Sequence, residues 1–177
     1  MPVSDSSTGE VIAEVPCCTR AEVEEAIEAA HRAFPAWSGT PVSKRAQLMF
    51  RYREILDAHL EELAVLAAKE LGKNLEEARG DVLKAIEVVE FACSVPNLMK
   101  GESLMNVSEG HDTVLYREPL GVFAGIAPFN FPAMIPYGWM IPLCIATGNT
   151  FVLKAASFTP LTLPIWPVIM NTATPAM

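Results

Sequence analysis

Three stretches in the first hundred residues repeat apolar side chains at the spacing of an amphipathic helix. Thr19-Arg20-Ala21-Glu22 opens the first with a capping-box pattern, and Pro35 closes it. Thr40 and Pro41 begin the second in the order of an N-cap and a first helical residue, and Gly72 is placed to cap its end. Within a helical region from 19 to 100, we expect helices over residues 19–35, 40–71 and 74–94.

The segments on either side of this region lack the helical spacing. Residues 1–18 are typical of an extended arm, with a turn at Thr8-Gly9-Glu10 and a short strand over 11–13. In 101–118, apolar residues alternate loosely with polar ones around a polar turn, which predicts a half-exposed, two-stranded hairpin. Because an exposed hairpin is normally protected by edge charges or by a partner chain, this segment is a candidate contact between subunits.

Residues 119–160 contain apolar runs without a polar face. Gly121–Ala127 and Thr150–Leu153 are typical of strands buried on both sides, as in a parallel sheet, and 132–147 predicts a buried helix between them. Strand, helix and strand in this order form a βαβ unit with parallel strands, so the fold class is α/β. In the tail, 161–177, prolines oppose a regular helix.

Composition and charge exclude several classes of protein. The chain has 177 residues, of which 51% are hydrophobic and 19% charged, enough for a sizeable core in one domain or slightly more. Its 13 Lys and Arg against 21 Asp and Glu give a net charge of −8, which argues against a nucleic-acid partner. The four cysteines do not form a disulfide scaffold, and the three histidines have no Cys or His at ligand spacing, so we expect no metal site.

Charge is nearly absent from the last third of the chain, where Lys154 is the only charged side chain between Pro119 and Met177. Prolines interrupt both uncharged stretches, so we expect no membrane span. The first ten residues have no basic start and no apolar run, so they do not resemble a secretory signal. A reducing compartment fits best, either the cytoplasm or, in a eukaryote, the mitochondrial matrix.

Two polar side chains follow the predicted strands of the βαβ unit, where open parallel sheets bind ligands. Asn130 lies between prolines and phenylalanines; its amide could stabilise an oxyanion, or it could cap the following helix. Lys154 needs an anion, which could be a sugar–phosphate ligand or a carboxylate elsewhere in the fold. Cys144 is a weak nucleophile candidate, because burial in an apolar helix would raise its pKa.

Two motifs in the same region resemble a known family. Pro119-Leu-Gly-Val-Phe-Ala-Gly-Ile-Ala-Pro-Phe-Asn-Phe-Pro132 and Ala146-Thr-Gly-Asn-Thr-Phe-Val-Leu-Lys154 resemble the N-terminal part of the aldehyde dehydrogenase superfamily. Within it, Pro-Phe-Asn-Phe-Pro-Ala-Met-Ile-Pro136 is similar to the methylmalonate-semialdehyde dehydrogenases. The resemblance, which we trace to about Pro160, implies a Rossmann-like NAD-binding domain with a preceding helical region and a hairpin used in homo-oligomers. The tail that follows, 161–177, is expected to diverge from the family. It also implies a small aldehyde as substrate, NAD as cofactor and coenzyme A as co-substrate.

The resemblance assigns roles to individual residues. It implies that Asn130 is the amide of the oxyanion hole and that Lys154 binds the adenosine ribose. Ser157 stands where many members have a ribose-binding glutamate. Lys84 stands where we align the arginine that grips the substrate carboxylate, and lysine keeps that charge without the bidentate fork. The cofactor cleft would be lined by Ile126, Ala127, Pro128 and Phe129.

Family members continue well beyond the length of this chain. The resemblance therefore implies an N-terminal part from which the catalytic domain, with its cysteine nucleophile and general-base glutamate, is absent. We expect such a chain to be inactive alone in the NAD-dependent oxidation of a semialdehyde to an acyl-CoA. The alternative is a non-catalytic fragment that acts at most as a weak nucleotide-binding or subunit-pairing module.

Overall fold

The computed structural model describes residues 1–162. Two short strands are followed by five helices, a hairpin and the βαβ region, in which a π-helix, η1, precedes the last described α-helix. The helical elements are α1 (Arg20–Ser38), α2 (Val42–Ala58), α3 (Leu60–Leu71), α4 (Leu75–Cys93), α5 (Val95–Leu98), η1 (Met134–Met140) and α6 (Ile141–Ala146). The strands are β1 (Pro2–Ser4), β2 (Val11–Glu14), β3 (Glu102–Ser108), β4 (His111–Leu115), β5 (Val122–Ile126) and β6 (Thr150–Lys154).

The described strands form three two-stranded sheets. β1 pairs with β2 and β3 with β4, both antiparallel, whereas β5 and β6 pair in parallel. The connection between β5 and β6 runs through η1 and α6, so the predicted βαβ unit and its parallel strands are confirmed.

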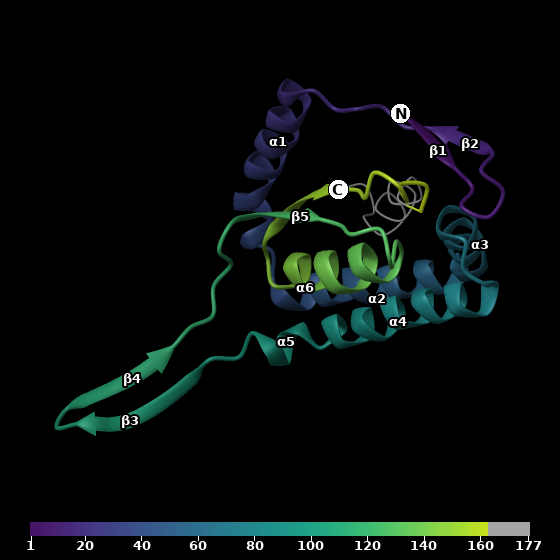
Figure 1. Ribbon diagram of the computed structural model, residues 1–177. Helices are drawn as coiled ribbons and strands as arrows, with labels where there is room; N and C mark the ends of the chain where they lie inside the picture. The colour runs from purple at the N-terminus through teal and green to yellow at the C-terminus, as the bar shows by residue number, and fades with distance from the viewer. Residues whose placement is uncertain (163–177) are drawn as a thin grey trace.

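The core lies between the βαβ unit and the N-terminal helices. η1 and α6 lie between the β5–β6 sheet and the layer formed by α2 and α4, while α1 packs beside the two strands (Figure 1). Apolar side chains of α2, α3, α4, η1 and α6 fill the space between these layers. Among the largest fully buried side chains are Tyr52, Leu56, Leu63, Val82, Val89 and Tyr137.

The first helix begins as predicted but continues past Pro35. Thr19 and Glu22 form the capping box, with Thr19 Oγ1 accepting from the Glu22 backbone N–H at 3.3 Å. α1 continues to Ser38, and Trp37 in its last turn donates its indole N–H to the Ile145 carbonyl at 3.0 Å. This tertiary contact outweighs the single helical hydrogen bond that proline removes.

The second predicted helix is divided in two. α2 ends at Ala58 and α3 starts at Leu60, so that Leu56 and Leu63, on either side of the break, are both fully buried. Pro41, not Thr40, occupies the N-cap of α2, since the Thr40 hydroxyl donates instead to the Ala36 carbonyl at 3.0 Å. A single apolar stripe does not reveal such a break, because both halves keep the helical spacing.

The hairpin and β5 are more exposed than predicted. Every residue of β3 and β4 is exposed, and the hairpin extends away from the rest of the chain (Figure 1). Along β5, Phe123, Ala124 and Ile126 are exposed, so this strand is not buried on both faces by the described residues. The apolar run of a parallel strand shows that it suits burial, but the covering layer has to come from other elements.

In the described part of the chain, no helix combines the length and the hydropathy needed to cross a bilayer.

Candidate functional site

The parallel pairing of β5 and β6 brings the segments that follow them to the same edge of the sheet. Ile126 lies opposite Lys154 in the register, and the Ala127 backbone N–H donates to the Lys154 carbonyl at 3.0 Å. At the other end, Asn149 Oδ1 accepts the backbone N–H groups of Leu120 at 2.6 Å and Gly121 at 3.0 Å. This buried amide ties the start of β6 to the segment before β5 and so fixes the register on which the site depends.

Asn130 lies in the turn after β5 and is exposed. The N-cap of η1 is Ala133, so Asn130 does not cap the following helix, which removes that alternative. Its side chain makes no hydrogen bond to any of residues 1–162, and the amide is therefore available to a ligand. The Phe129 carbonyl accepts from Thr159 Oγ1 at 3.3 Å, which connects this turn to the segment after β6.

Lys154 ends β6 and is also exposed. Its Nζ donates to the Ser157 hydroxyl at 2.9 Å. Within the described chain no carboxylate pairs with Lys154, so the alternative of an internal ion pair finds no support there. The ammonium keeps donors for a ligand, and the Ser157 hydroxyl keeps its own proton to donate.

Apolar side chains flank these polar groups. Ile126 is 76% exposed, Pro128 and Phe129 are also exposed, and Ala127 is buried. The rings of Phe129 and Phe158 meet edge to face, with their centroids 6.3 Å apart. The predicted cleft residues and Phe158 thus form an apolar surface beside Lys154. A planar ring of a ligand could pack against this surface.

Lys84 is not brought into this group by any contact in the structure. It lies on an exposed face of α4 and pairs with Glu87, with 2.5 Å between Nζ and Oε2. No hydrogen bond or ion pair within residues 1–162 connects it to the Asn130 turn. Its role toward a substrate carboxylate therefore stays a prediction.

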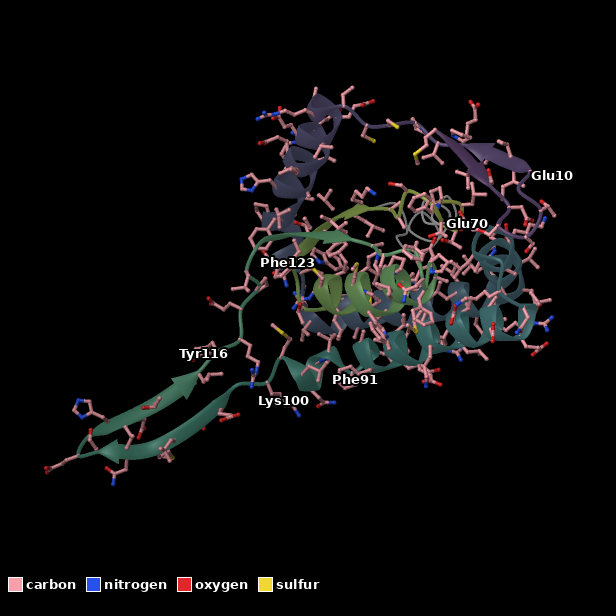
Figure 2. All side chains as sticks on the ribbon, in the orientation of Figure 1. Glu10, Glu70, Phe91, Lys100, Tyr116 and Phe123 are labelled. Atoms are coloured by element: carbon pink, nitrogen blue, oxygen red, sulfur yellow. The ribbon has the colours of Figure 1, made fainter. Side chains whose placement is uncertain are left out.

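Two polar side chains at the end of α3 were missed by the sequence analysis. Lys73 donates to the Asn130 carbonyl at 3.3 Å and pairs with Asp81. Glu70 is buried between α3 and the segment that follows β6 (Figure 2), and its Oε1 accepts the Leu161 backbone N–H. Desolvation raises the pKa of Glu70 to about 7, although the backbone N–H groups it faces lower it. Their partners lie 57 and 91 residues away along the chain, beyond the reach of a local pattern.

The cysteines of the core are poor nucleophiles. Burial raises the pKa of Cys144 to about 11 and raises that of Cys93 as well. Cys17 and Cys18 are exposed in the segment between β2 and α1. Within residues 1–162, no group of His, Cys, Asp or Glu side chains could hold a metal ion.

Comparison with known sequences identifies relatives over nearly the whole chain. Malonate-semialdehyde dehydrogenase 1 of Geobacillus kaustophilus is 50% identical over 161 residues, which are 91% of this chain and 33% of that enzyme. Malonate-semialdehyde dehydrogenase 2 of Bacillus cereus is 52% identical over 159 residues, 90% of this chain and 32% of that enzyme. The chain therefore spans about a third of the length of these curated relatives.

Solved structures share the fold. The methylmalonate-semialdehyde dehydrogenase DddC of Oceanimonas doudoroffii superposes with a TM-score of 0.93 at 42% identity, covering 99% of this chain and 36% of that one. A protein of Sinorhizobium meliloti 1021 solved with NAD gives 0.92 at 34% identity, with coverage of 99% and 36%. GapN of Methanocaldococcus jannaschii, a glyceraldehyde-3-phosphate dehydrogenase solved with NADP, gives 0.88 at 29%, with coverage of 97% and 37%.

The family model gives the same result as these individual relatives. The model described as the aldehyde dehydrogenase family matches residues 1–174, farther than the resemblance we traced to about Pro160. The predicted divergence of the tail falls mostly on residues 163–177, which lie outside the described structure. With its α/β fold, which matches the N-terminal part of the solved enzymes, the chain belongs to the aldehyde dehydrogenase family.

Proposed function

We propose that this chain forms one wall of the cofactor and aldehyde site of an NAD-dependent aldehyde dehydrogenase that converts a semialdehyde into an acyl-CoA. The observation that carries the proposal is the register of β5 and β6. It places the Asn130 turn and Lys154 at the same edge of a parallel sheet, both exposed and both with free donors. The names of the relatives support a semialdehyde as substrate.

The donors after β6 fit the ribose of a dinucleotide. Lys154 and Ser157 form a hydrogen-bonded pair that together offers an ammonium and a hydroxyl to a diol or a phosphate. Neither group is buried, so a ligand can reach both. NAD, when bound, would supply the hydride acceptor of the oxidation. The chain's own contribution is to orient the nucleotide against the apolar surface of Ile126 and Phe129.

Asn130 acts on the aldehyde in this proposal. Its Nδ2 donates to the carbonyl oxygen, where negative charge develops as a nucleophile attacks the carbon. Because the turn is connected to the segment after β6 through the Phe129 carbonyl and Thr159, the amide is held at a fixed place relative to Lys154. A donor held before the reaction requires little reorganisation when the charge appears.

The substrate carboxylate and the acyl acceptor complete the proposal. Lys84 would bind the carboxylate of a semialdehyde by releasing Glu87, an exposed partner whose attraction is weak in water. Coenzyme A as the acyl acceptor rests on the likeness to methylmalonate-semialdehyde dehydrogenases alone.

The exposed hairpin supports a second role, the pairing of subunits, because both strands leave unpaired edges.

Calorimetry with NAD tests the cofactor part of the proposal. We expect weak binding by this chain, because it supplies only one wall of the cleft, and we expect Lys154→Ala to abolish the binding that exists. Lys69→Gln is the matched control, since it removes a lysine that takes no part in the site. A sub-micromolar dissociation constant, or an affinity unchanged by Lys154→Ala, would contradict the proposal.

A turnover assay tests the assignment of the nucleophile. With propanal, NAD and coenzyme A, the chain should form no NADH, because burial raises the pKa values of Cys144 and Cys93 and so disfavours their reactive thiolates. Sustained turnover would show that one of the four cysteines is active and would overturn this assignment.

A further inference from the structure

A nearly buried cation, Lys73, lies between the end of α3 and the start of α4. Only 15% of its side chain is exposed, and its Nζ lies 2.5 Å from Oδ2 of Asp81, whose side chain is 10% exposed. The same Nζ lies 4.6 Å from the centroid of the Phe131 ring and donates to the Asn130 carbonyl at 3.3 Å. One ammonium therefore contacts α4 and both residues of the peptide bond that follows Asn130.

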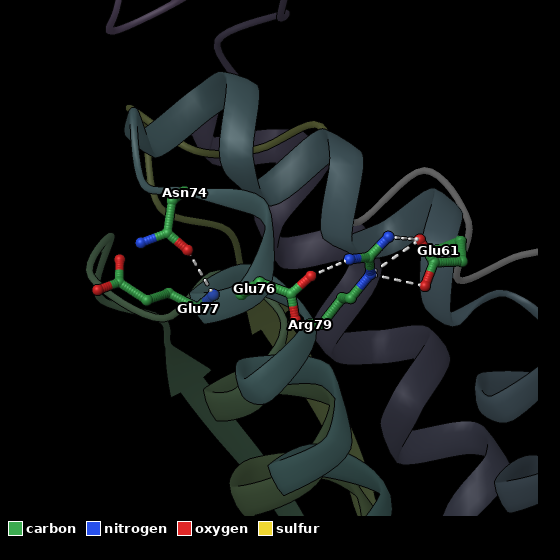
Figure 3. Close-up of polar contacts among 5 residues, drawn as sticks. All are labelled: Glu61, Asn74, Glu76, Glu77 and Arg79. Atoms are coloured by element: carbon green, nitrogen blue, oxygen red, sulfur yellow. Dashed lines mark hydrogen bonds and ion pairs between the residues drawn. The ribbon is translucent and has the colours of Figure 1, made fainter.

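The backbone that carries Lys73 is fixed on both sides. Gly72 ends α3 in the left-handed conformation, with φ of 73° and its N–H donating to the Ala68 carbonyl at 2.8 Å. Asn74 caps α4 by accepting the Glu77 N–H at 2.9 Å (Figure 3). With a cap on either side, the backbone of Lys73 is held in place.

The outer side of the same corner is braced separately. Arg79 of α4 binds Glu61 of α3 with Nε 2.8 Å from Oε1, and it also pairs with Glu76 (Figure 3). These exposed pairs hold α3 against α4 without contacting the Asn130 turn. The corner therefore has a second connection between α3 and α4, whereas the contact with the turn is made by Lys73, which Asp81 holds.

We propose that Lys73 and Asp81 are positioning residues that hold the Asn130 turn at the ligand-binding edge of the sheet. Asp81 fixes the ammonium, and the ammonium fixes the Asn130 carbonyl and the face of the Phe131 ring. Because the peptide plane after Asn130 is held from both residues, the backbone from which the Asn130 amide side chain extends has a defined position. The purpose of this arrangement rests on the proposed function, whereas the restraint itself does not.

Nuclear magnetic resonance relaxation on this chain tests the restraint directly. The double variant K73M/D81N removes both charges while keeping the side-chain sizes, so it leaves no unpaired buried charge. Lys69→Gln removes a charge one turn earlier and serves as the control. The buried side-chain amide of Asn149 is an internal reference, because its hydrogen bonds do not involve Lys73.

We expect the backbone order parameters of Asn130 and Phe131 to fall from about 0.85 to below about 0.6 in the double variant. The Asn130 side-chain NH2 should lose order with them, while Asn149 stays unchanged and Lys69→Gln has no effect. The single variant Lys73→Arg should keep most of the wild-type order at Asn130, because arginine keeps the positive charge. Unchanged order at Asn130 in the folded double variant would overturn the proposal.

A second variant decides the matter if the double variant does not fold. Asp81→Asn alone keeps the shape of the side chain and one acceptor oxygen, and it should lower the order at Asn130 partially; no change would overturn the proposal. These readouts need neither NAD nor an aldehyde. A failure of the proposed function would leave the loss of order in place, so the two failures are distinguishable.

Discussion

The carboxyl group of Glu70 is nearly inaccessible to water and accepts the Leu161 backbone N–H from the segment after β6. Among the described residues no donor reaches its Oε2 in good hydrogen-bond geometry, so the desolvation of the charge is only partly compensated. This explains why the pKa of Glu70 is raised to about 7. The folded chain therefore binds a proton at Glu70 more tightly than the unfolded chain does.

Glu70→Gln should separate the effect of Glu70 ionisation on stability from the effects of the other acidic groups. Since the folded pKa lies above the ordinary value of 4.5, the unfolding free energy falls as pH rises through the window from about 4.5 to 7. Between pH 5 and 8, the unfolding free energy of the wild-type chain should fall by roughly 2–3 kcal/mol more than that of the variant, whose glutamine cannot ionise. Urea unfolding at both pH values measures the difference, and parallel pH profiles would contradict the raised pKa.

Residues at strand ends were predictable, whereas those held by distant partners were not. Asn130 and Lys154 follow apolar runs that mark the ends of β5 and β6, so local pattern and fold rules were sufficient to place them. Lys73 resembles an ordinary surface lysine in sequence, because Asp81 and Asn130 meet it only in the folded chain. Lys84 pairs with Glu87 in the structure, and its role toward a substrate carboxylate stays a prediction.

At the scale of elements, helix termini set by local caps were predicted well, and boundaries set by packing less well. The caps at Thr19, Gly72 and Asn74 are local hydrogen-bonding devices that the sequence encodes within four residues. The continuation of α1 past Pro35 and the break at His59 depend on packing against other elements. Exposure of β5 was mispredicted for a related reason, because an apolar strand does not specify what covers it.

Two glycine substitutions test the cap that orients Lys73. Gly72→Ala places a side chain at φ of 73° and puts its Cβ 3.2 Å from the Ser6 Cβ, so it should destabilise the chain by about 1–2 kcal/mol. Gly80→Ala is the matched control inside α4, where a Cβ meets nothing within 4 Å, and it should stabilise by about 0.5–1 kcal/mol. Urea unfolding measures the change in unfolding free energy for each variant, which should be negative for Gly72→Ala and positive for Gly80→Ala. Equal changes would contradict the cap assignment.

At the scale of the whole molecule, two groups of exposed apolar side chains lie on the hairpin and at the β5–β6 edge. The hairpin extends from the body and exposes Leu104, Met105, Val107 and Val114 (Figure 1). Surfaces of this kind are typical of contacts with other chains. The second surface includes Ile126, Phe129 and Phe158, next to the proposed nucleotide site.

Self-association should depend on the hairpin. Replacing Leu104 and Val114 with lysine adds charge to both strands, and this double variant should stay monomeric at concentrations where the wild-type chain associates. The control replaces Val23 and Ile27, which are exposed on α1, with lysine and should associate like wild type. Sedimentation velocity over a concentration series distinguishes the two, and association of the hairpin variant at wild-type strength would contradict the assignment.

The most direct measurement of the central claim is a titration of the isotope-labelled chain with millimolar NAD, followed by amide chemical shifts. If the edge after β5 and β6 is the nucleotide site, the shifts will concentrate at Ala127, Lys154 and Ser157, leave the hairpin unchanged, and disappear in Lys154→Ala. Shifts spread evenly over the chain, or the same shifts in Lys154→Ala, would show that NAD does not use this edge.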